Sequence, residues 1–190
     1  MEDQQIKTIL QERQGWFDGH TRFRSGKHSN GWIEKGCIIR HPSSLNLITK
    51  LQASQIFNHF PDAQLLIGAP LCGAIVAGHV ARHLDLDLAV TIRQTNGLWF
   101  HRMNIPVQGT RAVLVEDMIC TGSDVSEHIQ FFNEFGIELL GVSTWINRQL
   151  NYIAGCLVTS LIPAPFENYS EMNCPMCQSN IPIQYDNIRE

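Results

Sequence analysis

The chain has 190 residues, of which 44% are hydrophobic and 17% charged, and its formal net charge is −4. This size suits one globular domain with one core, and the slightly acidic balance excludes a general attraction to nucleic acid or an anionic membrane. The polar start at residues 1–5 lacks a secretory signal, and no apolar run approaches the roughly 20 residues of a membrane span. Together with six scattered cysteines, these features predict a reduced, cytoplasmic setting.

The first 60 residues predict two helices separated by a glycine-rich, basic stretch. Ile6, Ile9 and Leu10 fall on one face of a first helix, which should end near Gly15. The glycine-rich, basic stretch follows at residues 19–36. A proline and two serines after residue 41 then open a second helix, whose apolar residues recur at helical spacing: Leu45, Ile48, Leu51 and Ile56.

From residue 64 the chain alternates short apolar runs with amphipathic segments. Strands are expected at 65–67, 88–90, 112–115 and 139–146, with helices at 74–84 and 125–135. Such alternation is typical of βαβ units, so the predicted fold class is α/β, a doubly wound and mainly parallel sheet. A run at 156–162 is expected to add an edge strand, and residues 163–190, with four of the eight prolines, to form an irregular C-terminal tail.

Residues 93–111 form the longest stretch without a clear hydrophobic period, and residues 99–102 make its tip. Loops of this length inside compact domains are usually functional lids or disordered segments. We expect a flexible lid, with disorder as the alternative.

The strongest chemical signal lies at residues 113–123. An apolar strand ends in Glu116 and Asp117 and runs through a turn of small residues into a helix, at the edge where open α/β sheets bind ligands. The free N–H groups of the turn and the helix dipole suit a phosphate, helped by the hydroxyls of Thr121 and Ser123. The two carboxylates could hold sugar hydroxyls or a Mg²⁺ ion. The plainer interpretation is a capped helix after a buried strand.

Residues 113–123 resemble the motif with which type I phosphoribosyltransferases bind phosphoribosyl pyrophosphate (PRPP). Residues 23–29, residues 68–74 and the pair Asn147-Arg148 resemble orotate phosphoribosyltransferases in particular. Cys174-Pro175-Met176-Cys177, followed by Ile181-Pro182, resembles a tail found in one bacterial subgroup. The similarity covers nearly the whole chain and implies a single domain at 1–190, with an N-terminal hood segment at 1–40, a PRPP-binding core at 64–148 and the tail at 163–190.

The resemblance implies a role for each matching residue. The acidic pair would bind the ribose hydroxyls, and the turn would bind the 5-phosphate through Cys120, Thr121, Gly122, Ser123 and Asp124. Pro70 and Gly73 would contact pyrophosphate, Arg24 and Lys27 would lie near PRPP and the base, and Arg93 would lead into the lid. Arg148 would pair with the carboxylate of orotate, which arginine can bind through two hydrogen bonds. Each cation taken singly could instead be a solvated surface residue.

The implied activity is transfer of the phosphoribosyl group of PRPP to orotate, giving orotidine 5′-monophosphate and pyrophosphate in pyrimidine biosynthesis. The resemblance implies Mg²⁺ as cofactor, contacted by Glu116 and Asp117 through PRPP, and a homodimer whose partners are PRPP and orotate, without nucleic acid or membrane. Two alternatives stay open: a phosphoribosyltransferase for another base, such as uracil or a purine, and a non-catalytic PRPP-binding regulatory protein.

The chain also departs from the family pattern. Residues 94–98 supply none of the lysines and histidines common in the lid, so His101 and Arg102 are the candidates for catalytic roles there. Cys120 replaces a usual threonine in the phosphate turn. Asp124 stands where a small residue is common; it could face the phosphate and repel it, but capping of the helix together with Glu127 is the preferred interpretation.

Two other motifs resemble metal sites. Cys174 and Cys177 could be half of a four-ligand zinc site, but no second pair stands at suitable spacing, so a reduced pair or an occasional disulfide is favoured. His79 and His83, four residues apart, are interpreted as part of a helix face.

Overall fold

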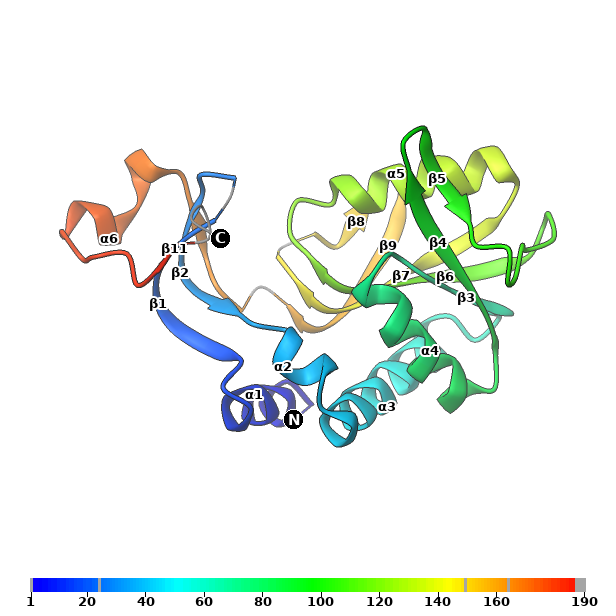
Figure 1. The fold of residues 1–190 in the computed structure, drawn as a ribbon, viewed down its shortest axis with the longest axis horizontal. Coiled ribbons are helices and arrows are strands. Elements are labelled where there is room, and N and C mark those ends of the chain that lie inside the picture. Colours follow the sequence, from blue (N-terminus) through cyan, green and yellow to red (C-terminus); the bar gives the residue numbers. More distant parts are fainter. Residues whose placement is uncertain (1, 24, 149, 164, 187–190) are drawn as a thin grey trace.

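The computed structural model describes residues 2–23, 25–148, 150–163 and 165–186, whose strands form one sheet of seven and one of four (Figure 1). In spatial order the large sheet contains β5 (Gly97–Phe100), β4 (Asp87–Gln94), β3 (Leu65–Gly68), β6 (Arg111–Ile119), β7 (Glu138–Asn147), β9 (Cys156–Pro163) and β8 (Tyr152–Ile153). From β4 to β9 the neighbouring strands pair in parallel, and β5 and β8 pair antiparallel at the edges. The predicted mainly parallel α/β sheet is confirmed.

Helices cover both faces of this sheet. On one face lie α1 (Glu2–Glu12), α3 (Pro42–His59) and α4 (Cys72–Leu84), and on the other lies α5 (Ser123–Phe135). Side chains of a strand alternate between faces, so Val113 and Val115 of β6 pack with the first group and Ala112 and Leu114 with the second. All four are fully buried, which explains the unbroken apolar run in the sequence.

The second helix begins as expected. His41 precedes Pro42 in extended conformation, and its Nδ1 accepts a hydrogen bond from Ser44 N at 3.4 Å. Pro42 occupies the first turn, where its missing N–H costs nothing. A four-residue helix, α2 (Gly36–Ile39), lies just before it.

The run at 156–162 is a strand, but its predicted position at the edge is wrong. β8 pairs with the outer side of β9 through a tight turn, in which Ala154 and Gly155 both have positive φ. Turns of this kind match the twist of a hairpin, and their commonest signal is Asn-Gly rather than Ala-Gly. The two-residue strand before the turn is too short to show a period.

A small sheet forms the hood, at the left in Figure 1. Its central hairpin consists of β1 (Trp16–Arg22) and β2 (His28–Ile33), flanked by β11 (Tyr185–Asp186) and β10 (Asn168–Tyr169) respectively. The tail also contains a 3₁₀ turn (Glu171–Asn173) and α6 (Pro175–Gln178). The tail expected to be irregular thus completes the hood, because its strands supply backbone partners for two otherwise open edges.

The stretch at 93–111 is only partly irregular. β4 continues to Gln94, turns at residues 95–96, and returns antiparallel as β5. Phe100 at the end of β5 packs against three aromatic rings of α5, those of Phe131, Phe132 and Phe135. The prediction of an aperiodic loop is therefore wrong for residues 97–100, since burial alternates there from Leu98 to Phe100.

Within the described residues, no helix is both long and apolar enough to cross a membrane.

Candidate active site

A cavity of about 360 Å³ lies between the hood and the carboxyl ends of β6 and β7. The hood and tail contribute one group of wall residues: Phe23, Ser25, Lys27, Trp32, Ile33, Glu34, Lys35, Asn168 and Tyr185. The core contributes a second group: Met118, Cys120, Thr121 and Arg148. The cavity therefore depends on segments from both ends of the chain, and we call it the base cavity.

Arg148 is the buried cation of the base cavity. Only 9% of it is exposed, its Nη1 donates to Asn168 Oδ1 at 2.6 Å, and its guanidinium carbon lies 4.4 Å from the centre of the Phe23 ring. Burial lowers the pKa of the Arg148 guanidinium, but arginine starts high enough to remain charged. A planar group with five donors can bind Asn168 and a carboxylate together.

Lys27 brings a second cation to the same wall. It stands in the turn between β1 and β2, beside Ser25. Arg24, predicted for the same region, lies outside the described residues. The structure thus brings together Lys27 and Arg148, which are 121 residues apart in sequence.

A second cavity of about 220 Å³ adjoins the first, and we call it the phosphate cavity. It shares four wall residues with the base cavity: Lys35, Met118, Cys120 and Thr121. The others are Glu116, Ile119, Gly122, Asp124 and Val125. The predicted acidic pair and phosphate turn therefore meet around one space next to the base cavity.

The phosphate turn leads directly into α5. Thr121 Oγ1 and Ser123 Oγ lie 2.9 Å apart, and both residues are exposed. Gly122 has φ +79, and a Cβ there would come within 3.0 Å of Leu150 and Ile153. Only glycine meets both demands cheaply, so the turn keeps its backbone N–H groups at the helix start, where they can bind an anion.

The acidic pair belongs to the end of β6 rather than to a loop after it. Asp117 is 2% exposed, and its Oδ2 lies 2.5 Å from Lys35 Nζ. Glu116 is half-buried and packs against Gly73 at the start of α4. A Cβ at position 73 would lie 2.9 Å from Glu116 Oε1 and 2.8 Å from Val115 O, so this approach requires glycine.

The charge state of the pair follows from this packing. Burial, together with the neighbouring Asp117 carboxylate, raises the pKa of Glu116 to about 8. Burial disfavours the ammonium of Lys35, but Asp117 more than offsets this and raises the pKa of Lys35 above its ordinary value. Near neutral pH the pair therefore carries a proton on Glu116 and an ion pair at Asp117.

Lys35 is a functional candidate that the sequence did not single out. It precedes α2, lines both cavities and is the ionic partner of Asp117. Its only signal in the sequence is membership of the basic stretch at 19–36, because its carboxylate partner lies 82 residues further along the chain.

The turn after β3 lies at the same edge of the sheet. β3 pairs in parallel with β6, so that Gly68 stands opposite Val115, and Ala69 N donates to Val115 O at 3.2 Å. The peptide bond between Pro70 and Leu71 is cis. Pro70 and Gly73, predicted to contact pyrophosphate, thus lie in a turn whose end touches Glu116.

The predicted capping role of Asp124 is wrong. α5 begins after Gly122 without a side-chain cap, and Asp124 is its second residue. Asp124 Oδ1 accepts from Arg93 Nη2 at 3.3 Å, and the Glu127 carboxylate accepts from Arg93 Nη1 at 2.7 and 2.8 Å. Both acidic residues bind the end of β4 because a guanidinium is within reach, and Arg93 fixes the hairpin to α5.

The remaining predicted residues lie elsewhere. His101 N donates to Val90 O at 2.8 Å, and its Nδ1 accepts from Met103 N at 3.1 Å. The walls of the base and phosphate cavities, as described, include neither His101 nor Arg102. Their catalytic role stays a prediction. His83 Nε2 lies 3.4 Å from Thr49 Oγ1 of α3, on a helix face as interpreted.

The chain was compared with known proteins. No family model matches it. It is 30% identical to an orotate phosphoribosyltransferase of Desulforamulus reducens over 186 residues, which is 96% of this chain and 95% of that protein. It is 27% identical to that of Caldanaerobacter subterraneus, over 96% of each chain. The crystal structure of orotate phosphoribosyltransferase from Aeropyrum pernix matches with a TM-score of 0.71 at 20% identity, over 82% of this chain and 92% of that one.

These relatives match the chain almost from end to end, and the fold and the two adjoining cavities agree with the resemblance carried by residues 23–29, 68–74 and 113–123. The chain belongs to the orotate phosphoribosyltransferase family.

Proposed function

We propose that this chain is an orotate phosphoribosyltransferase, which transfers the phosphoribosyl group of PRPP to orotate in the biosynthesis of UMP. The observation that carries the proposal is the buried Arg148 guanidinium in the wall of the base cavity. A cavity of about 360 Å³ is within the size range of small-molecule sites. A carboxylated pyrimidine gives a buried guanidinium the partner that it needs in order to be favourable there.

The phosphate cavity supplies the complementary half of the site. The N–H groups of the turn and the hydroxyls of Thr121 and Ser123 suit the 5-phosphate of PRPP. Glu116 and Asp117 suit the ribose hydroxyls, which donate hydrogen bonds to carboxylate oxygens. Because the two cavities share wall residues, the base and the sugar can meet where they adjoin.

In the proposed reaction, a bond forms between a ring nitrogen of orotate and the anomeric carbon of PRPP. The bond from that carbon to pyrophosphate breaks, and the leaving oxygen keeps the electron pair. Negative charge grows on pyrophosphate, so Lys27 and Lys35 are the cations that can stabilise it. The orotate anion is itself a nucleophile, so we assign no general base.

Mg²⁺ is part of the proposal as an ion that enters with PRPP. The residues fit this role better than that of a separate ion site, because Asp117 is paired with Lys35 and Glu116 holds a proton near neutral pH. Glu116 and Asp117 would contact the ion indirectly, through the sugar and phosphates. When bound, Mg²⁺ neutralises part of the pyrophosphate charge.

We also propose that the protein is cytoplasmic and acts as a homodimer, with residues 93–111 as a mobile lid. Three apolar side chains of the lid, Met103, Ile105 and Val107, are 63%, 58% and 77% exposed, which supports a contact with a second subunit. Light scattering tests the dimer, and a strict monomer across the working concentration range would refute it.

The test of the activity is loss of orotate absorbance with PRPP and Mg²⁺, with EDTA as the control and uracil and adenine as parallel substrates. Loss of orotate alone, abolished by EDTA, is the expected result. Use of uracil or adenine instead would favour another base specificity. PRPP binding without turnover would favour a regulatory protein, an alternative motivated by Asp124 in the wall of the phosphate cavity and by the lysine-poor lid.

A further inference from the structure

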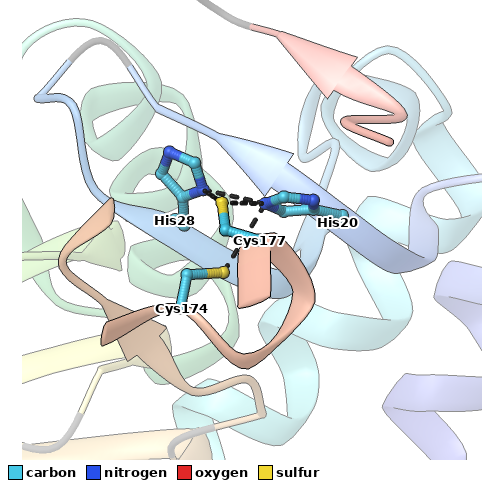
Figure 2. A group of neighbouring side chains, drawn as sticks. All are labelled: His20, His28, Cys174 and Cys177. Atoms are coloured by element: carbon cyan, nitrogen blue, oxygen red, sulfur yellow. Dashed lines mark hydrogen bonds between the residues drawn. The ribbon is translucent and has the colours of Figure 1, made fainter. Parts of the chain in front are cut away.

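Four metal-type side chains meet where the tail packs on the hood (Figure 2). Within the described residues, His20, His28, Cys174 and Cys177 form the one group of three or more such ligands, and their ligand atoms all lie within 4.8 Å of one another. His20 comes from β1, His28 from β2, and the two cysteines from the start and body of α6. We call this group the His-Cys cluster.

The distances within the His-Cys cluster match a tetrahedral ion. A zinc ion with bonds of roughly 2.3 Å to sulfur and 2.0–2.1 Å to nitrogen sets its sulfur and nitrogen ligands about 3.6 Å apart. Cys174 Sγ and Cys177 Sγ both lie 3.6 Å from His20 Nε2, and Cys177 Sγ lies 3.3 Å from His28 Nδ1. The two ring nitrogens are 2.8 Å apart and would separate by about 0.5 Å around such an ion.

His20 is oriented as a ligand. Its Nδ1 lies 2.7 Å from the carbonyl oxygen of Ile181, which can only accept a hydrogen bond. Nδ1 therefore carries the proton, and the lone pair of Nε2 points at the other three ligand atoms. Metal-bound histidines are commonly held in this way, with the second ring nitrogen donating to a carbonyl or carboxylate.

Burial excludes an open, exchangeable site. His20 and His28 are each 1% exposed and Cys174 is fully buried, while Cys177 is half-buried. Two sulfurs and two imidazoles without a carboxylate favour zinc over the oxygen-seeking Mg²⁺ or Ca²⁺. Four protein ligands fill a tetrahedral shell, which is typical of structural rather than catalytic zinc.

We propose that the His-Cys cluster binds one Zn²⁺ ion, which holds the tail onto the hood. The ion would fix residues 174–177 against the hairpin of β1 and β2. The segments on either side of this point, β10 and β11, supply Asn168 and Tyr185 to the wall of the base cavity. Zinc would thus stabilise one side of the substrate site from a distance, without contact to the substrate.

The sequence concealed half of this site. A zinc motif usually presents its second ligand pair at short spacing, whereas His20 and His28 precede Cys174 by 154 and 146 residues. The pairing of β1 with β2 brings the two imidazole rings to 5.0 Å between centroids, on the side where α6 packs.

The test is the metal content of the purified full chain, prepared without a metal-affinity tag, measured by mass spectrometry. We expect about one zinc per chain. Cys177→Ser and His28→Asn should lose the zinc, whereas the matched control Cys156→Ser, outside the cluster, should keep it. Cobalt substitution should give the visible absorption of tetrahedral, thiolate-bound Co²⁺, and this band should vanish in Cys177→Ser.

A second measurement uses the unchanged chain, in case the variants fold poorly. Removal of zinc by a strong chelator should lower the melting temperature by about 5 °C or more, and added Zn²⁺ should restore it. Less than about 0.1 zinc per chain with no effect of added Zn²⁺ would overturn the proposal. A Cys174–Cys177 disulfide in protein from a reducing cytoplasm would overturn it too, and iron in place of zinc would overturn the choice of ion. None of these readouts depends on orotate turnover.

Discussion

Lys35 Nζ lies 2.5 Å from Asp117 Oδ2 at the junction of the base and phosphate cavities. The carboxylate is 2% exposed at the end of a central strand, and the lysine reaches it from the segment between the hood and α3. One ion pair therefore joins the moving parts of the site to its floor.

Lys35→Met should destabilise the protein by about 1–3 kcal/mol, because it leaves the Asp117 charge buried without its partner. Urea unfolding measures this change, with Lys50→Met on the exposed face of α3 as the matched control. The double variant Lys35→Met/Asp117→Asn should recover part of the loss. If the double variant is less stable than Lys35→Met alone, an uncompensated charge is not the cause.

Glu116 predicts how stability depends on pH. Its pKa is about 8 in the folded chain against an ordinary value of 4.5, so between these values the folded state binds more protons than the unfolded state. The stability due to this group is complete below about pH 4.5 and is lost as the pH rises through about 8. Denaturant unfolding at several pH values should show a decline that is weaker in Glu116→Gln. An identical decline in the variant would assign the effect to other groups.

Arg148→Ala should lower kcat/KM for orotate by about 10²- to 10³-fold, roughly 3–4 kcal/mol, because the substrate carboxylate would enter a buried cavity without its cation. Binding of PRPP, measured by calorimetry, should change little, since the phosphate turn does not use this side chain. Arg40→Ala, at an exposed arginine, is the control. A larger effect on PRPP binding than on orotate use would remove Arg148 from its assigned role.

Gly73→Ala should weaken PRPP binding, because the added methyl group would lie 2.9 Å from Glu116 Oε1 and displace the carboxylate. Gly78→Ala is a sharp control in the same helix: its Cβ would meet only Leu88 Cδ2, at 3.7 Å. That change should stabilise α4 by about 0.5–1 kcal/mol and leave binding intact. Equal affinity for PRPP in the two variants would contradict the proposed use of Glu116.

Local sequence predicted the large sheet because its strands are buried on both faces. The apolar run at 112–115 and the small-residue turn after Asp117 each carry their structure in adjacent residues. What it did not predict depends on distant partners. β10 and β11 are two residues long and exist only because β2 and β1 offer open edges.

The candidate site divides in the same way. Glu116, Asp117 and the phosphate turn are contiguous, so their grouping was visible in the sequence. Lys35 is recognisable only once the fold brings it to Asp117, and Asp124 satisfied every local condition for a cap until Arg93 came within reach. The histidines of the His-Cys cluster likewise have no partner nearby in the sequence.

The hood also sets an order of events during synthesis. β1 and β2 leave the ribosome early, but both strands that flank them come from residues 168–186. The core strands can pair as they emerge, whereas the hood sheet must wait for contacts that span more than 130 residues. We therefore expect a nascent chain to form the nucleotide-binding floor first and to acquire its ability to hold orotate only at the end of translation.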